Sequence, residues 1–213
     1  PKVRQLLYDG KNEEATKLAG ETMMGIPERI LSYQSLGDLI IETTPTQGIE
    51  DYFRSLDLDT GIATVSYVID RVKYTREVFA SHPQDCIALR WLGDEPGCIS
   101  AQIALKRLNP QDGKIIRQDA ECLSEEGNRL ILRGQINRPH HETGENVGMK
   151  FEAHCLAKVM GGTVTNENGV LTISGADELV LLLVSATNYR GDDPEKICRD
   201  HTTGLLHKTF SAL

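Results

Sequence analysis

The chain has 213 residues, of which 39% are hydrophobic and 25% charged, and its formal net charge is −8 at pH 7. By length it forms one domain, or at most two small ones, with a sizeable core. The acidic balance argues against a nucleic-acid partner, because phosphate binding needs clustered Lys and Arg. No apolar run reaches the roughly eighteen residues of a membrane helix, so we expect no membrane partner.

The first part of the chain predicts two short helices separated by Asp9-Gly10. Their apolar faces are Val3, Leu6 and Leu7, followed by Ala15, Leu18 and Ala19. The chain begins at Pro1 with no initiator Met, so we expect a processed or trimmed piece of a longer protein.

From Leu36 onward the hydrophobic period changes to two, and we count about nine strand candidates before the C-terminal end. In CISAQIALK, Ile99 and every second residue to Leu105 point inward. In MKFEAHCLAKV, Met149 and every second residue to Val159 form a core face, and the other face is expected to be wet. The residues of that other face are Lys150, Glu152, His154 and Lys158.

Turns and connections complete the pattern. Asn168-Gly169 predicts a hairpin turn. The regions Asn109–Asn128 and Arg138–Asn146 are interpreted as irregular connections, and Asp193-Pro194 as a helix start. The pattern predicts a mainly β fold, a large antiparallel β-sandwich with short helices at the N- and C-terminal ends.

The triplet Asp59-Thr60-Gly61 is the local signature of an aspartic protease. Such a site needs two carboxylates about 3 Å apart, and one triplet per chain would therefore require a symmetric dimer. We favour the alternative, a turn, because Asp bonds its own backbone and Gly accepts a positive φ.

The other candidate chemistry has simpler interpretations. His140-His141, with Glu142 nearby, lacks further ligands at metal spacing and fits an exposed loop. His154 and Cys155 are neighbours on a strand and point to opposite faces, which excludes a dyad between them. The acid pairs Asp177-Glu178 and Asp192-Asp193 fit solvated turns, Gly161-Gly162 lacks a phosphate-loop context, and Trp91 fits core packing.

The five cysteines are widely spaced and form no C-x-x-C motif. They are Cys86, Cys98, Cys122, Cys155 and Cys198. We interpret them as free, buried small hydrophobes, which leaves the compartment unassigned. The residues alone therefore predict no catalytic, cofactor-binding or metal-binding site and no cofactor.

Read together, five segments resemble the N-terminal domain of glycoside hydrolase family 95, the α-L-fucosidases and related α-L-galactosidases. They are VRQLLYDGKNEEATKLA, YQSLGDLIIE, YFRSLDLDTGIATVSY, VKYTREVFASHP and GADELVLLLVSATNY, in that order. The resemblance covers nearly the whole chain, and REVFAS and LDLDT are its most specific parts.

The resemblance implies a galactose-mutarotase-like supersandwich over residues 1–190, with the family's first strands lying before Pro1. It implies that residues 191–213 begin a linker toward an (α/α)₆ barrel, which holds the catalytic residues and lies beyond Leu213. We therefore expect the chain to be part of a longer parent protein, a glycoside hydrolase that acts on fucosylated glycans. The resemblance alone implies that this parent is exported. We expect no activity in this fragment by itself. The domain would pack against and support the barrel.

Two positions depart from the family pattern, Ser35 and the Asp70-Arg71 turn. Arg is a poor residue at positive φ, so we expect this turn to differ. A free-standing carbohydrate-binding module is the alternative function. Missing strands would leave sheet edges exposed, and we then expect self-association.

Overall fold

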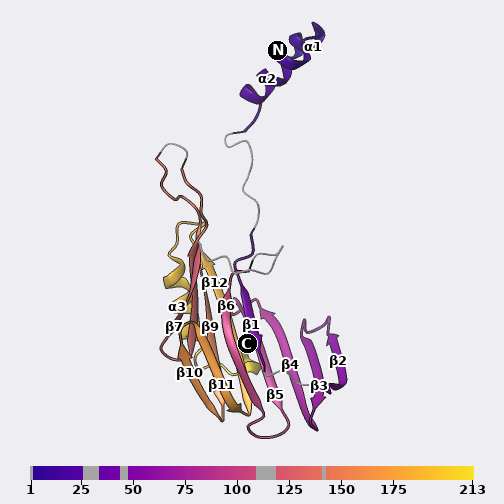
Figure 1. Ribbon diagram of the computed structural model, residues 1–213, viewed down its shortest axis with the longest axis vertical. Helices are drawn as coiled ribbons and strands as arrows, with labels where there is room; N and C mark the ends of the chain where they lie inside the picture. Colours follow the sequence, from indigo (N-terminus) through magenta and orange to yellow (C-terminus); the bar gives the residue numbers. More distant parts are fainter. Residues whose placement is uncertain (1, 26–33, 44–47, 109–118, 141–142) are drawn as a thin grey trace. The chain divides into compact units, whose positions relative to one another are not determined.

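The computed structural model describes residues 2–25, 34–43, 48–108, 119–140 and 143–213 (Figure 1). It divides into two units, residues 1–34 and 35–213. The first unit contains α1 (Lys2–Tyr8) and α2 (Asn12–Thr22), which pack on each other and bury Ala15. The prediction of two short N-terminal helices is confirmed, and Gly10 turns the chain between them at φ 74°.

The second unit contains two antiparallel sheets. The smaller sheet has the order β1-β6-β11-β10, and the larger has the order β2-β3-β4-β5-β12-β9-β8-β7. The strands of the smaller sheet are β1 (Asp38–Glu42), β6 (Ile99–Lys106), β10 (Thr163–Glu167) and β11 (Val170–Ala176). The strands of the larger sheet are β2 (Glu50–Leu56), β3 (Ala63–Ile69), β4 (Val72–Ser81), β5 (Cys86–Gly93), β7 (Ala120–Glu125), β8 (Arg129–Gln135), β9 (Lys150–Met160) and β12 (Glu178–Thr187). The predicted β-sandwich is confirmed.

The main core lies between the sheets. Ile99, Ala101, Ile103 and Leu105 of β6 are all buried there, as the alternation predicts, against residues such as Leu179 and Leu181 of β12. The turn at Asn168-Gly169 joins β10 to β11, with both residues at positive φ. These parts of the fold follow directly from period-two patterning and turn chemistry.

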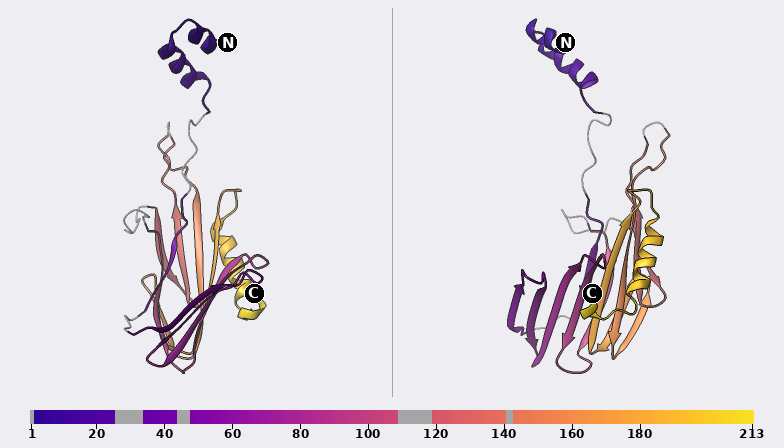
Figure 2. Two further views of the ribbon diagram at one scale, coloured as in Figure 1. Left: turned by 90° about the vertical axis from the view of Figure 1, so that its right-hand side faces the viewer. Right: turned by 180° about the vertical axis from the view of Figure 1, so that it is seen from behind.

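A second core lies on the outer face of the larger sheet, beneath α3 (Pro194–Leu205) and the short 3₁₀ helix η1 (Phe210–Ala212) (Figure 2). Asp193 caps α3 by accepting a hydrogen bond from the Glu195 amide at 3.1 Å. Leu205, Cys198 and Val184 are buried in this core. The prediction that residues 191–213 begin a linker stays a prediction; within this chain they cover the sheet. No described helix is long and apolar enough to span a bilayer.

The helix α3 overturns one expectation. The face of β9 that carries Glu152 and His154 was expected to be wet, but these side chains are only 5% and 0% exposed. The strand pattern correctly separates the two faces. Glu152 and His154 are buried because α3 packs on β9 and β12, whereas Lys150 at the start of the strand stays exposed.

Two local expectations are also wrong. Within Asn109–Asn128, Ala120–Glu125 form β7, whose Ala120 and Cys122 pack against the main core, while residues 109–118 lie outside the described part. The turn at Asp70-Arg71 was expected to differ from the family's hairpin turn. It is nevertheless a two-residue connection between β3 and β4, with both residues at positive φ, 50° and 68°. The adjacent strand pairing holds Arg71 in the left-handed region, which Arg seldom adopts.

Candidate functional site: an aromatic pocket with one arginine

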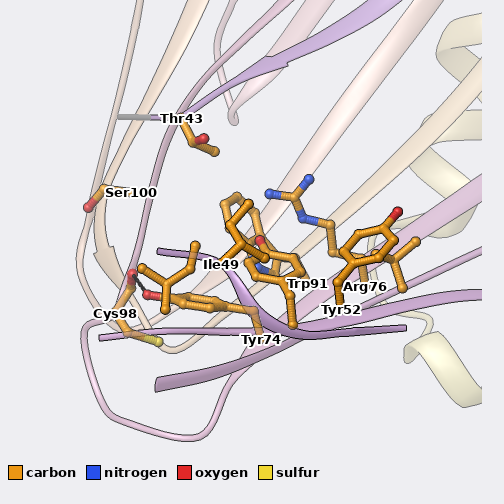
Figure 3. A pocket seen from close by; sticks show the side chains of 11 residues that line it. Thr43, Ile49, Tyr52, Tyr74, Arg76, Trp91, Cys98 and Ser100 are labelled. Carbon is orange, nitrogen blue, oxygen red and sulfur yellow. Dashed lines mark hydrogen bonds between the residues drawn. The ribbon is translucent and has the colours of Figure 1, made fainter. Parts of the chain in front are cut away.

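A pocket of about 500 Å³ lies at the β2–β5 end of the larger sheet, with Thr43 and Ser100 contributed by the side of the smaller sheet (Figure 3). Its aromatic lining consists of Tyr52, Tyr67, Tyr74 and Trp91. Among the lining residues that the structure describes, Arg76 is the cation and none is a carboxylate.

Strand register brings the aromatic residues together. Tyr67 of β3 lies opposite Tyr74 of β4, and Arg76 lies opposite Trp91 of β5, so all four side chains share the inner face. The rings of Tyr67 and Tyr74 stack with their centroids 5.3 Å apart, and Tyr74 lies 6.1 Å from Trp91. The guanidinium carbon of Arg76 lies 4.0 Å from the Trp91 ring centroid and 5.5 Å from that of Tyr67. This arrangement is a cation–π contact.

Two buried N–H groups of the pocket, on Trp91 and Arg76, lack a hydrogen-bond partner among the described residues. Trp91 is 3% exposed, and neither its indole Nε1 nor the Nε of Arg76 has a hydrogen-bond partner in the part of the chain that the structure describes. Tyr74 donates from its hydroxyl to the Cys98 carbonyl at 3.2 Å. Burial raises the pKa of Tyr67 above its usual value, and the nearby Arg76 charge opposes this effect.

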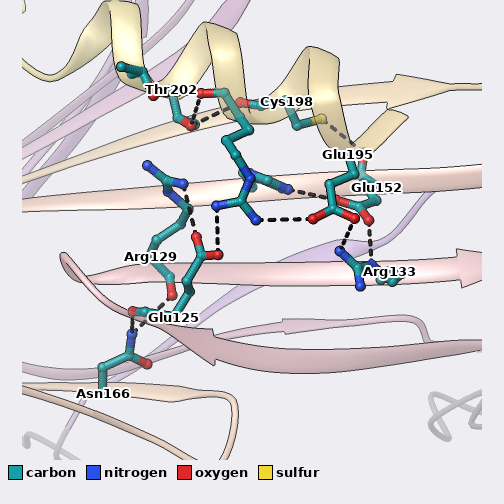
Figure 4. A network of polar contacts seen from close by, with 11 residues as sticks. Glu125, Arg129, Arg133, Glu152, Asn166, Glu195, Cys198 and Thr202 are labelled. Atoms are coloured by element: carbon teal, nitrogen blue, oxygen red, sulfur yellow. Dashed lines mark hydrogen bonds and ion pairs between the residues drawn. The ribbon is translucent and has the colours of Figure 1, made fainter. Parts of the chain in front are cut away.

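A network of alternating charges joins α3 to the larger sheet (Figure 4). Glu125 of β7 binds Arg129 of β8 at 2.9 Å and Arg199 of α3 at 2.8 Å. Arg199 also binds Glu195, 3.1 Å away in the preceding turn of α3.

Arg133 of β8 completes this network. It contacts Glu195 of α3 at 2.8 Å and Glu152 of β9. The three glutamates and three arginines balance in charge, and their ion pairs hold α3 on the larger sheet. Because each glutamate of the network is paired with an arginine, none of the three is free for acid–base chemistry. We interpret the network as structural.

His154 sits at the buried end of this network. Its Nε2 lies 2.7 Å from Glu152 Oε2, and its Nδ1 has no partner among the described residues. Burial lowers the pKa of His154, while Glu152 acts in the opposite direction. Cys155, the next residue, lies in the main core on the other face of β9, which agrees with the prediction that the two side chains form no dyad.

The structure places the sequence candidates in turns and loops. Asp59 lies in the exposed corner between β2 and β3, where its amide donates to Asp57 Oδ1 at 2.9 Å. The hydrogen bonds from the amides of Asp59 and Thr60 lower the pKa of Asp57. The Asp-Thr-Gly triplet is therefore a turn, as favoured from the sequence.

The remaining acidic and histidine candidates do not converge. Asp177 accepts a hydrogen bond from the Gly97 amide at 2.7 Å, and Asp193 caps α3. His140 lies in the loop after β8, while residues 141–142 lie outside the described part. No group of three or more His, Cys, Asp and Glu side chains could hold a metal ion among the described residues.

The pocket was missed because its side chains come from separate strands. Trp91 was interpreted as packing, and its low exposure agrees, but its ring also forms a pocket wall. The available signal was the alternation of Tyr74 and Arg76 on one face of β4. An arginine on an inward face of a strand is unusual.

Comparisons with known proteins place this fold in a family. The family model described as "Glycosyl hydrolase family 65, N-terminal domain" matches residues 1–192. The chain belongs to this family. The resemblance to the N-terminal domain of fucosidase-like glycoside hydrolases is confirmed by curated relatives as well.

The relatives of this family member are much longer than the chain. "Alpha-L-fucosidase 2" of Arabidopsis thaliana is 29% identical over 99% of this chain and 27% of its own length. "Probable alpha-fucosidase A" of Aspergillus oryzae is 46% identical over 85% of this chain and 25% of its own length. The chain therefore spans about a quarter of the curated relatives it matches. A solved structure provisionally titled as a kojibiose phosphorylase from the human microbiome aligns with a TM-score of 0.45 and 12% identity, over 77% of this chain and 23% of that one.

Proposed function

We propose that the chain is the non-catalytic N-terminal domain of an α-fucosidase-like glycoside hydrolase and that it packs against and supports a catalytic barrel. The observation that carries the proposal is the family match over residues 1–192, in a chain that spans about a quarter of relatives named as fucosidases. The parent's substrate would be a fucosylated glycan.

The polar groups support a non-catalytic role. Glycosidases generally act through two carboxyl groups that converge on the glycosidic bond. In this chain the described pocket beside Arg76 has no carboxylate in its lining, and the glutamates beneath α3 are paired with arginines. Neither place offers an acid and a base facing a common space.

The first test is an activity assay of the purified chain with 4-nitrophenyl α-L-fucoside. We expect nitrophenol release equal to that of buffer, with the Arabidopsis relative as the active control. Hydrolysis by the chain at a rate close to that of the relative would contradict the proposal.

The supporting role is tested separately in the Arabidopsis relative by deleting the segment that aligns with this chain. We expect a lower melting temperature and a loss of soluble protein, because a face of the remaining protein loses its cover. A deletion variant with unchanged melting temperature and turnover would show that the segment supports nothing.

The alternative, a free-standing carbohydrate-binding module, is favoured only by the aromatic pocket. Calorimetry with fucosylated oligosaccharides separates the two functions. The supporting domain gives no saturable heat, whereas the binding module does.

A further inference from the structure

We propose that the pocket between β2–β5 and Thr43 binds a carboxylate-bearing saccharide, with Arg76 pairing with the carboxylate. The proposal does not depend on the assignment to a fucosidase-like parent, because it concerns only the lining residues of this chain. It also differs from the module hypothesis in ligand class, since fucosylated oligosaccharides can be neutral.

The charge of the pocket favours an anion. Within the described residues Arg76 has no ion-pair partner, whereas Arg90 binds Glu77 at 2.6 Å on the opposite face of the same two strands. A partly buried cation without a counter-charge is unfavourable. A carboxylate would supply that charge, and guanidinium binds carboxylates through two parallel hydrogen bonds.

The unpaired donors favour the same ligand. Buried N–H groups in proteins normally have acceptors, and a carboxylate offers acceptors only. The Nε of Arg76 and the Nε1 of Trp91 are both covered from solvent and unpaired among the described residues. The guanidinium lies over the face of the Trp91 ring, with its carbon 4.0 Å from the ring centroid (Figure 3).

The walls favour a saccharide as the body of that ligand. Aromatic faces pack against the C–H faces of a pyranose, and Thr43 and Tyr52 are hydroxyl-bearing residues in the lining. The volume of about 500 Å³ falls within the range of roughly 300–1,000 Å³ that is typical of small-molecule sites.

Trp91 is the sole tryptophan of the chain, so its fluorescence reports this pocket directly. The experiment titrates the chain with D-galacturonate, D-glucuronate, D-galactose and acetate at constant ionic strength. We expect a saturable change with at least one uronate and binding at least about tenfold weaker for galactose and acetate. Equal binding of acetate would overturn the saccharide, and equal binding of galactose would overturn the carboxylate.

Two further outcomes would overturn the proposal. One is the absence of any saturable change with either uronate. The other is tighter binding of an aspartate-containing peptide than of both uronates, which would assign the pocket to a polypeptide carboxylate.

Variants then locate the contact. Arg76→Met keeps the aliphatic stem and is expected to weaken uronate binding at least about tenfold. Lys73→Met is the matched control, because Lys73 is exposed on the opposite face of the same strand. Unchanged binding by folded Arg76→Met would contradict the assignment. If that variant does not fold, Arg76→Lys replaces it and is expected to bind severalfold more weakly.

Discussion

At the scale of single residues, His154 shows how a neighbouring element changes the chemistry of a side chain. Its position on β9 alternates with the core face, which would place it in solvent in a two-layer sandwich. Beneath α3 it is fully buried and contacts Glu152. Burial lowers the pKa of His154, so its imidazole binds a proton more readily in the unfolded chain than in the folded protein.

This environment predicts a pH-dependent stability. Because the folded-state pKa of His154 is lowered, the unfolded chain binds more protons as the pH falls below the usual histidine value of about 6.5. The wild type should therefore lose stability relative to His154→Gln between pH 7 and 5. Urea unfolding at several pH values measures this, with the exposed His207→Gln variant as control. Parallel pH profiles for wild type and His154→Gln would contradict the prediction.

At the scale of secondary-structure elements, α3 is held to the larger sheet by apolar and polar contacts together. Leu205 and Cys198 enter the second core, and the glutamate–arginine network binds the other side of the helix. Lys158 of β9 also donates hydrogen bonds to the carbonyls of Leu205 and Lys208, each at 2.7 Å. These bonds give partners to carbonyl groups at the end of α3 and just after it. Burial lowers the pKa of Lys158.

The apolar part of this attachment is testable with adjacent leucines. Leu205 is 2% exposed and Leu206 is 41% exposed. We expect Leu205→Ala to lower the free energy of unfolding by about 2–5 kcal/mol, because it leaves a cavity beneath α3. Leu206→Ala should cost less than about 1 kcal/mol. Chemical denaturation measures both, and equal losses would show that α3 is not anchored through Leu205.

The strands and turns could be predicted where they depend on local pattern. Ile99 to Leu105 alternate cleanly, and Asn168-Gly169 is a strong hairpin signal, so β6 and the β10–β11 hairpin follow from the sequence. The covered face of β9 could not be predicted, because its cover comes from a helix some forty residues later in the chain. β7 was missed because its charged residues obscure a short apolar alternation.

The candidate site was less predictable than the fold. Tyr67, Tyr74 and Trp91 lie on three successive strands, and only the pairing register brings them to one face. The sequence pattern predicts strands but not their register. The β3–β4 register depends on the two-residue turn at Asp70-Arg71, and the β4–β5 register depends on the connection after Ser81. The pocket therefore depends in part on a turn in which Arg71 adopts a positive φ, a conformation that Arg seldom takes.

At the scale of the whole sandwich, the two sheets differ in width. The larger sheet has eight strands and the smaller has four, and β2 lies at one edge of the larger sheet. Its burial pattern is exposed throughout, and Tyr52, Phe53 and Leu56 are each more than half exposed. An edge strand with such residues is a surface for pairing with another chain.

We therefore expect self-association through β2 in the isolated chain. Light scattering should show an average mass that rises with protein concentration, and Phe53→Lys should reduce this rise by placing a charge at the edge. Tyr189→Lys is the control, because Tyr189 is 79% exposed in the loop before α3. A wild-type chain that stays monomeric at high concentration would contradict the prediction.

Two of the free cysteines can report the order in which the layers of this sandwich separate. Cys155 lies in the core between the sheets and Cys198 in the core beneath α3, and burial raises the pKa of both thiols to about 12. Neither reacts with an alkylating reagent until its layer separates, since the thiolate is the reactive form. The order in which the two become alkylated, followed by mass spectrometry, therefore tells whether the helix lifts from the sheet before the sheets part.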